Sequence, residues 1–133
     1  MDPVLRILVV DDDTLVTQTL AGALEDTCSA QVWAAGSGEE GVRLAALHKP
    51  DLILLDLDMP GRDGLDVCRA VREQPDTRET TIWILTGLPP EAERMETAAA
   101  LADQVLIKPV SLGDLTLAIQ ATITPKGPWL RWA

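Results

Sequence analysis

The chain has 133 residues, of which 47% are hydrophobic and 24% charged, a balance that favours one globular domain with its own core over a disordered chain. The formal net charge of -10 disfavours direct contact with nucleic acid or an anionic membrane, and suits a protein partner or a cation. No apolar run reaches the ~20 residues that a membrane-spanning helix needs.

The compartment is inferred from the start of the chain and from its two cysteines. No cationic leader followed by an apolar segment opens the sequence, so a signal peptide is not indicated. Cys28 and Cys68 are too far apart for a CxxC motif, and we expect two buried thiols rather than a disulfide. These features predict a cytoplasmic protein.

Apolar runs and helical periodicity alternate along the chain, and caps and breakers separate them. The pattern predicts five strands, at residues 6–10, 32–35, 52–55, 81–85 and 105–107. It predicts five helices, at residues 14–25, 37–47, 65–71, 89–102 and 112–123. Five strand–helix units with short connections favour a mostly parallel sheet with helices on both faces.

The third predicted strand is the unbroken apolar run from Leu52 to Leu55, which suits a strand covered on both faces. The run ends at Asp56, and Pro60, Gly61 and Gly64 then break regular structure. Asp56 therefore lies at the carboxyl end of a buried strand, where open α/β sheets place their chemistry. Taken alone, this aspartate is equally well explained as the start of a turn.

Polar side chains follow the other predicted strands as well. Asp11 and Asp12 follow the first strand, Thr86 follows the fourth, and Lys108 follows the fifth. Taken singly, these residues also fit a solvated helix start, a strand-end hydroxyl and an exposed charge. In one parallel sheet, however, all of them share an edge with Asp56. Their convergence would give a carboxylate-rich site of the kind that suits a hard cation such as Mg²⁺.

Charge balance supports a cation at this edge. Two carboxylates ~5 Å apart at an effective dielectric constant of ~20 repel each other by roughly 3 kcal/mol. Three carboxylates facing only Lys108 would be costly without a divalent ion, or would raise the pKa of one acid. A charge of +2 makes the cluster nearly neutral. Asp13 is assigned as a helix cap outside this cluster.

The order and spacing of these motifs resemble the receiver domain of two-component response regulators, over residues 6–123. The matching motifs are Ile-Leu-Val-Val-Asp-Asp at 7–12, Asp-Leu-Asp-Met-Pro at 56–60, Asp-Gly at 63–64, Thr-Gly at 86–87 and Lys-Pro at 108–109. The resemblance implies a flavodoxin-like, doubly wound (βα)5 sandwich of three layers, with a parallel five-stranded sheet in the order 2-1-3-4-5. The receiver domain is expected at residues 5–124, with a short C-terminal tail at residues 125–133.

The resemblance also assigns a phosphoryl acceptor and a metal site. Asp56 would accept a phosphoryl group from a sensor histidine kinase or a phosphotransfer protein. Asp12 and Asp56 would bind Mg²⁺, or Mn²⁺ in its place, through their side chains. Asp11 would act through a bridging water, and Asp58 through its backbone carbonyl, so that the Asp58 side chain is not required for metal binding.

Two further residues receive roles in phosphoryl recognition and switching. Lys108 would pair with the phosphoryl oxygens, and Thr86 would donate a hydrogen bond to them and switch partner binding. Pro109 is expected to follow a cis peptide bond. These roles describe a signalling switch rather than an enzyme, with at most self-catalysed phosphoryl transfer and autodephosphorylation.

Two positions depart from the family pattern. Many receivers carry Tyr or Phe three residues before the lysine, but this chain has Val105 there and contains no Phe or Tyr. We therefore expect any switch to run through Thr86 and the loop that follows it. Leu101 stands where the family commonly has a Gly before the fifth strand, so the fourth helix is expected to end differently.

The resemblance places a homodimer or partner surface on the fourth helix, fifth strand and fifth helix. No pattern for a helix-turn-helix or a catalytic output domain follows Ile123, so the expected target is a separate protein or an output domain cut away from this chain. Trp129 and Trp132 in the tail are expected to dock onto the domain or a partner. Direct contact with nucleic acid or membrane is not expected.

Two alternative functions use the same residues. Asp56 and Asp58 also resemble the DxD motif of haloacid-dehalogenase-type phosphatases, which would make the chain a hydrolase. That motif normally ends the first strand, however, and here it ends the third. The second alternative is a receiver-like binding module that works without phosphorylation. The complete acidic, Thr and Lys set argues against it.

Overall fold

The computed structural model describes residues 4–60, 63–89 and 92–125. Strands and helices alternate through these residues, as predicted. The strands are β1 (Arg6–Val10), β2 (Gln31–Ala35), β3 (Leu52–Asp56), β4 (Thr81–Thr86) and β5 (Gln104–Ile107). The helices are α1 (Thr14–Cys28), α2 (Gly38–His48), α3 (Gly64–Glu73), α4 (Glu93–Leu101) and α5 (Leu112–Thr122).

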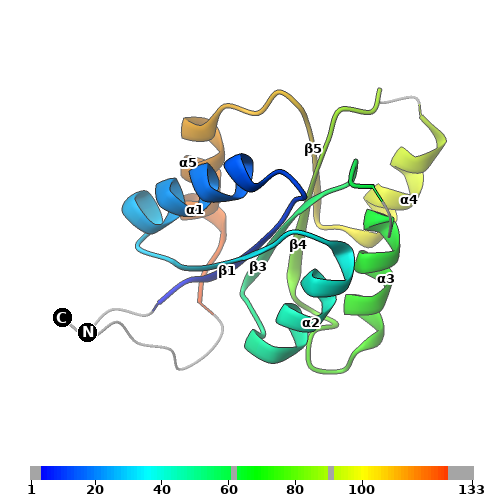
Figure 1. Ribbon diagram of the computed structural model, residues 1–133, viewed down its shortest axis with the longest axis horizontal. Helices are drawn as coiled ribbons and strands as arrows, with labels where there is room; N and C mark the ends of the chain where they lie inside the picture. Colours follow the sequence, from blue (N-terminus) through cyan, green and yellow to red (C-terminus); the bar gives the residue numbers. More distant parts are fainter. Residues whose placement is uncertain (1–3, 61–62, 90–91, 126–133) are drawn as a thin grey trace.

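The five strands form one parallel sheet in the order β2-β1-β3-β4-β5. Helices α1 and α5 cover one face, and α2, α3 and α4 cover the other (Figure 1). Parallel neighbours require such crossovers, because a hairpin would reverse the strand direction. The predicted three-layer, doubly wound fold and its strand order are therefore confirmed.

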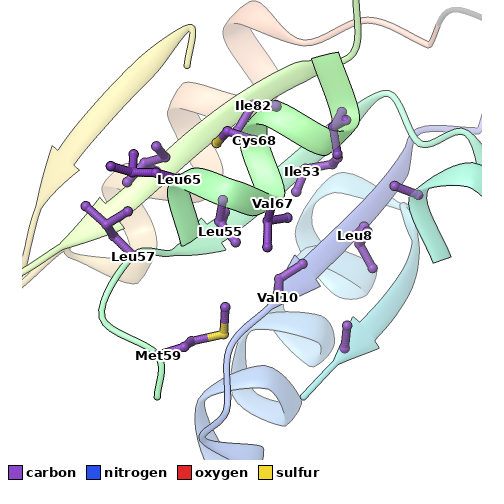
Figure 2. Packing of buried hydrophobic residues seen from close by; sticks show 14 of the residues in the cluster. Leu8, Val10, Ile53, Leu55, Leu57, Met59, Leu65, Val67, Cys68 and Ile82 are labelled. Carbon is purple, nitrogen blue, oxygen red and sulfur yellow. The ribbon is translucent and has the colours of Figure 1, made fainter. Parts of the chain in front are cut away.

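β3 lies in the centre of the sheet, and all five of its residues are buried. Ile53 and Leu55 point to the face that packs against α3, where Val67 and Cys68 meet them (Figure 2). Leu52 and Leu54 belong to the cluster on the opposite face, with side chains from α1 and α5. Because alternate residues face opposite helical layers, both faces of this strand must be apolar. This packing holds Asp56, its last residue, in place at the carboxyl end of the sheet.

Several boundaries and burials differ from the predictions. α1 continues to Cys28 and is closed by Ser29 in the left-handed conformation, with φ 53°. Cys28 is only half-buried, whereas the free thiol of Cys68 is buried as expected. Burial raises the pKa of both thiols, that of Cys68 to about 11. α1 is longer than its apolar periodicity suggested because polar residues continue the helix on its exposed side.

The fourth helix begins later than predicted, at Glu93, because the backbone of Ala92 before it is extended rather than helical. Its predicted first residues, Pro90 and Glu91, lie outside the described part of the chain. The helix ends with Leu101 in helical conformation and Ala102 extended at φ -98°, so no left-handed residue closes it. The expected change at this end is thus confirmed.

Two other parts of the sequence analysis also fall outside the described residues. They are Gly61 in the loop after β3 and the tail at residues 126–133, which contains Trp129 and Trp132.

Within the described ranges, no helix combines the length and apolar character that crossing a bilayer requires.

Gly64 opens α3 against the loop that carries Asp56. A Cβ atom at Gly64 would lie 3.1 Å from the Leu57 Cα and 3.2 Å from the Asp56 carbonyl oxygen. Gly64→Ala is therefore expected to lower the free energy of unfolding by about 2 kcal/mol, because the backbone must shift to make room. Gly22→Ala is the matched control, since a Cβ there meets nothing within 4 Å and should add about 0.5–1 kcal/mol. Denaturant unfolding of both variants measures the difference, and equal stabilisation by the two would contradict the close approach.

Candidate functional site

The carboxyl edge of the sheet gathers the polar residues singled out in the sequence. Asp56 is the last residue of β3 and Thr86 the last of β4. Asp11 follows β1 directly, and Lys108 follows β5 directly. Because the strands are parallel, these residues all lie at one edge, where each strand passes into a loop.

Three carboxylates form a cluster at this edge. Asp11, Asp12 and Asp56 each contribute an oxygen, and these oxygens lie within 4.8 Å of one another. Asp11 and Asp56 are 5% exposed, whereas Asp12 is open to solvent. Backbone amides orient the two buried acids: Asp13 N–H donates to Asp11 Oδ1 at 2.9 Å, and Asp58 N–H donates to Asp56 Oδ1 at 3.0 Å. A dense set of carboxylate oxygens with one exposed side fits a hard divalent cation that keeps several waters.

Lys108 supplies the positive charge of the site. Its Nζ donates to Asp56 Oδ1 at 3.0 Å, and its side chain is 38% exposed. Burial is the largest single effect on the pKa of Lys108 and favours a lower value, but the hydrogen bond to Asp56 acts to raise it. The charges of Asp56, Asp11 and Asp58 act in the same direction, so the pKa is raised overall. The Lys108–Pro109 peptide bond is cis, as expected.

Asp11 is the acid whose ionisation is most disturbed. Burial raises its pKa from 3.8 to about 6, and the negative charges of Asp56 and Asp12 act in the same direction. The Asp13 amide and Lys108 oppose the shift without cancelling it. The charge crowding expected from the sequence therefore contributes to the raised pKa of Asp11, but burial is the larger cause.

The Asp11 shift predicts how the metal-free protein responds to pH. Because the folded state holds the proton up to about pH 6 and the unfolded chain only to about pH 4, a stabilising contribution present below pH 4 is lost as the pH rises to 6. With a chelator present to remove metal ions, the free energy of unfolding of Asp11→Asn should therefore exceed that of the parent by about 1–2 kcal/mol at pH 7. Near pH 4 the two free energies should be equal. Thermal unfolding across this range measures the effect. Glu25→Gln, an exposed helix acid, controls for net charge, and a pH-independent difference for Asp11→Asn would contradict the assignment.

Thr86 is fully buried, and its hydroxyl contacts Asp58. Thr86 Oγ1 donates to Asp58 Oδ1 at 3.0 Å and accepts from the Leu88 N–H at 3.1 Å. The Gly87 N–H donates to Asp58 Oδ2 at 2.9 Å. No partner for the Asp58 side chain was predicted from the sequence. Its position two residues beyond a strand end was the only available signal, since the loop that it meets lies far away in the chain.

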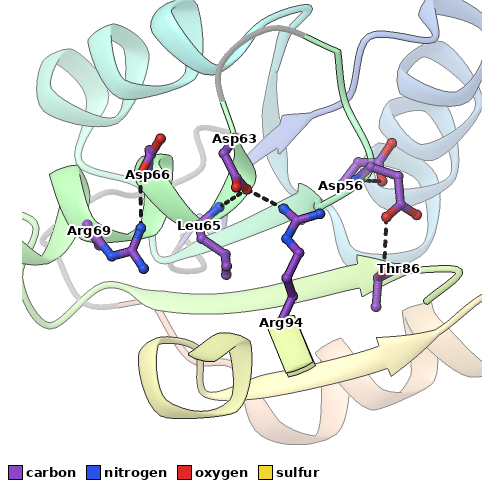
Figure 3. Close-up of polar contacts among 8 residues, drawn as sticks. Asp56, Asp63, Leu65, Asp66, Arg69, Thr86 and Arg94 are labelled. Atoms are coloured by element: carbon purple, nitrogen blue, oxygen red, sulfur yellow. Dashed lines mark hydrogen bonds and ion pairs between the residues drawn. The ribbon is translucent and has the colours of Figure 1, made fainter. Parts of the chain in front are cut away.

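A second contact ties the loop after β3 to α4, and this contact too was absent from the sequence argument. Asp63 caps α3 through Oδ1, which accepts from the Leu65 N–H at 3.0 Å. The same oxygen pairs with the guanidinium of Arg94 in α4 (Figure 3). The Asp-Gly motif at 63–64 thus starts a helix and also anchors the neighbouring helix.

A doubly wound sheet in the order 2-1-3-4-5, with an acidic cluster, a buried threonine and a lysine at its carboxyl edge, defines the receiver class of signalling domains. The comparison with known families agrees. The chain belongs to the response regulator receiver domain family, whose sequence model matches residues 7–120. It is the receiver domain of a two-component response regulator, and receivers of this family are signalling switches that typically bind Mg²⁺ in an acidic pocket.

Individual relatives give the same result. The transcriptional regulatory protein PdtaR of Mycobacterium tuberculosis is 39% identical over 121 residues, covering 90% of this chain and 57% of that protein. ResD of Bacillus subtilis is 37% identical over 89% of this chain and 48% of its own length. Among solved structures, the chemotaxis response regulator CheY4 of Vibrio cholerae matches with a TM-score of 0.80 at 29% identity, over 89% of this chain and 98% of that one. The chain spans about half the length of the curated relatives it matches.

Proposed function

We propose that Asp56 accepts a phosphoryl group from the phosphohistidine of a sensor histidine kinase or a phosphotransfer protein. A carboxylate oxygen of Asp56 would attack phosphorus in line, and the bond to the histidine nitrogen would break. The observation that carries the proposal is the buried Asp56 carboxylate, 5% exposed, with the Lys108 ammonium 3.0 Å away and two further carboxylates beside it. Within this cluster, Asp56 is the acid that ends the central, fully buried strand.

The acidic cluster fits Mg²⁺, or Mn²⁺ in its place. Asp12 and Asp56 would hold the ion through side-chain oxygens, Asp11 through a bridging water and Asp58 through its backbone carbonyl. When bound, the ion supplies positive charge that neutralises the carboxylates and the phosphoryl oxygens. Lys108 adds an ammonium that would follow the phosphoryl group from its present contact with Asp56.

Thr86 is the proposed switch residue. Its hydroxyl would turn to the phosphoryl oxygens, and the loop after β4 would move with it. Val105, in the neighbouring strand β5, is a half-buried aliphatic residue packed against the core. The proposed switch therefore involves no movement of an aromatic ring. Free and beryllofluoride-bound forms should differ at Thr86 and in the loop after it, and an unmoved loop would reject this route.

The experiment that tests phosphorylation uses acetyl phosphate as a small donor in the presence of Mg²⁺. The intact chain should gain the mass of one phosphoryl group, and Asp56→Asn should gain none. Asp66→Asn, an exposed acid on α3, controls for the loss of one carboxylate and should react as the parent does. An unmodified parent chain, or an equally modified Asp56→Asn, would reject the proposal. Continuous release of phosphate without a stable increment would instead support the DxD hydrolase alternative.

The remaining assignments are proposals that family membership supports. Membership implies a histidine kinase as partner, and the longer relatives indicate that an output domain often follows the receiver. We propose residues 5–124 as the receiver and 125–133 as a tail. We propose that the protein is cytoplasmic and that it signals by contact with another protein rather than with nucleic acid. The face formed by α4, β5 and α5 is the proposed surface for self-association or a target.

A further inference from the structure

The Asp58 carboxylate binds the junction between β4 and the loop that follows it. Its Oδ1 accepts the Thr86 hydroxyl at 3.0 Å, and its Oδ2 accepts the Gly87 N–H at 2.9 Å. Both oxygens of one side chain are therefore used on two consecutive residues, the last residue of β4 and the first residue of the loop after it. This two-point contact fixes both the rotamer of Thr86 and the path of the backbone at Gly87.

The Thr86 hydroxyl has no second proton to give. A hydroxyl has one O–H donor, and here it points to Asp58 while the oxygen accepts from the Leu88 N–H at 3.1 Å. Thr86 is 0% exposed, so water cannot replace a lost partner, and a buried hydroxyl without an acceptor is costly. The hydroxyl can leave Asp58 only for another acceptor.

We propose that Asp58 is a positioning residue that acts as an internal anion, holding the Thr86 hydroxyl and the Gly87 amide until a phosphoryl group on Asp56 displaces it. The inference rests on the proposed function of Asp56. Both anions attract the same donors, because charge-assisted hydrogen bonds to a carboxylate or a phosphoryl group use the same N–H and O–H groups. The Asp58 carboxylate is thus a competitor of the phosphoryl group.

The unequal burial of the two partners makes the exchange feasible. Asp58 is exposed, so water can solvate its carboxylate when Thr86 leaves. Thr86 passes directly from one anion to another and keeps an acceptor throughout. Removing Asp58 would leave Thr86 without its present acceptor and would shift the equilibrium toward the phosphoryl-bound position.

The charge of Asp58 alone offers a simpler account, since any nearby carboxylate repels an anionic ligand. The two accounts differ in whether Thr86 is needed. If Asp58 acts by holding Thr86, then the effect of removing Asp58 must shrink once the hydroxyl is gone. If it acts by charge alone, then the effect must be independent of Thr86.

The test is beryllofluoride affinity in Mg²⁺, measured for a double-mutant cycle of Asp58→Ala and Thr86→Ala. Asp58→Ala should bind beryllofluoride about 10-fold more tightly than the parent, a change of ~1.4 kcal/mol. In the Thr86→Ala background, Asp58→Ala should increase the beryllofluoride affinity by less than about 3-fold. In the Thr86→Ser background, which keeps the hydroxyl, Asp58→Ala should give the full increase in affinity. Asp58→Asn should gain less than Asp58→Ala, because its amide oxygen still accepts from Thr86. Equal gains in all backgrounds would overturn the proposal.

A second readout needs neither metal nor phosphate analogue. In the free protein, the Gly87 amide hydrogen should exchange about 10-fold faster in Asp58→Ala than in the parent, because its acceptor is gone. Unchanged exchange would overturn the proposal even if the affinities shift. The failure of the proposed function looks different: the parent would neither bind beryllofluoride nor take up a phosphoryl group, while the exchange at Gly87 would still respond to Asp58.

Discussion

Replacing Lys108 with methionine is expected to slow phosphoryl incorporation from acetyl phosphate by about 100-fold. Lys108 places its Nζ 3.0 Å from Asp56 Oδ1, so it lies beside the oxygens that carry charge when phosphorus is transferred. Removing one preorganised donor from such a position typically costs a factor of 10²–10³. Methionine keeps most of the side-chain length, so the loss isolates the charge and its hydrogen bond.

Cation binding should change in the opposite direction in the same variant. The Lys108 ammonium repels any cation that enters the cluster of Asp11, Asp12 and Asp56, and its removal relieves a repulsion on the order of 1 kcal/mol. Lys108→Met should therefore bind Mg²⁺ several-fold more tightly while it accepts the phosphoryl group more slowly. This split separates lost catalysis from a damaged site, because damage would weaken both.

Lys49→Met is the matched control for Lys108→Met. Lys49 follows α2 at the opposite end of the sheet, and its ammonium forms a long, exposed ion pair with Asp76 at 3.7 Å. The change in net charge is the same, so the control should leave the phosphorylation rate within about 2-fold of the parent. If Lys108→Met behaves as Lys49→Met does, then Lys108 has no part in the reaction.

The sequence was sufficient for those features that repeat or break a pattern. The apolar run of residues 52–55 predicts the buried strand β3 because a strand covered on both faces has no polar side. Asp56, Thr86 and Lys108 were found because each interrupts such a run at its carboxyl end. Once the strands are parallel, their common edge follows from topology alone, without any knowledge of side-chain packing.

Contacts between loops were beyond sequence reasoning. Asp58 reaches Thr86 and Gly87, and Asp63 reaches Arg94, across separations that no periodicity encodes. Each of these contacts depends on the distance between two neighbouring segments, and side-chain packing determines that distance. The same holds for Arg72, whose place on the polar side of α3 gives no sign of the acceptors that it finds.

Arg72→Met is expected to lower the free energy of unfolding by about 3 kcal/mol. The guanidinium of Arg72, at the end of α3, donates to three backbone carbonyls and one carboxylate, those of Leu101 (3.0 Å), Arg78 (2.8 Å), Thr80 (2.5 Å) and Asp103 (3.0 Å). Hydrogen bonds to a charged donor contribute about 1.5–3 kcal/mol each and do not add fully. The side chain is 22% exposed, so water replaces the lost donors only in part.

The arrangement of these acceptors explains why the loss should be large. They lie in two segments, the approach to β4 at residues 78–80 and the connection between α4 and β5 at residues 101–103, so one side chain joins both segments to the end of α3. Asp103 also accepts the Ile82 N–H at 2.8 Å, and Arg72 therefore supports the start of β4 through a second residue.

Arg69→Met on the same helix is the control for Arg72→Met, since it removes the same charge and the same side-chain type. Arg69 is about half exposed, and within the described ranges its one ion pair is with Asp66 one turn away, at 2.9 Å. Such a pair contributes less than about 0.5 kcal/mol. Denaturant unfolding of the two variants should therefore separate by more than about 2 kcal/mol. A difference below 0.5 kcal/mol would mean that the segments around Arg72 are held by apolar packing of β4 and β5 alone.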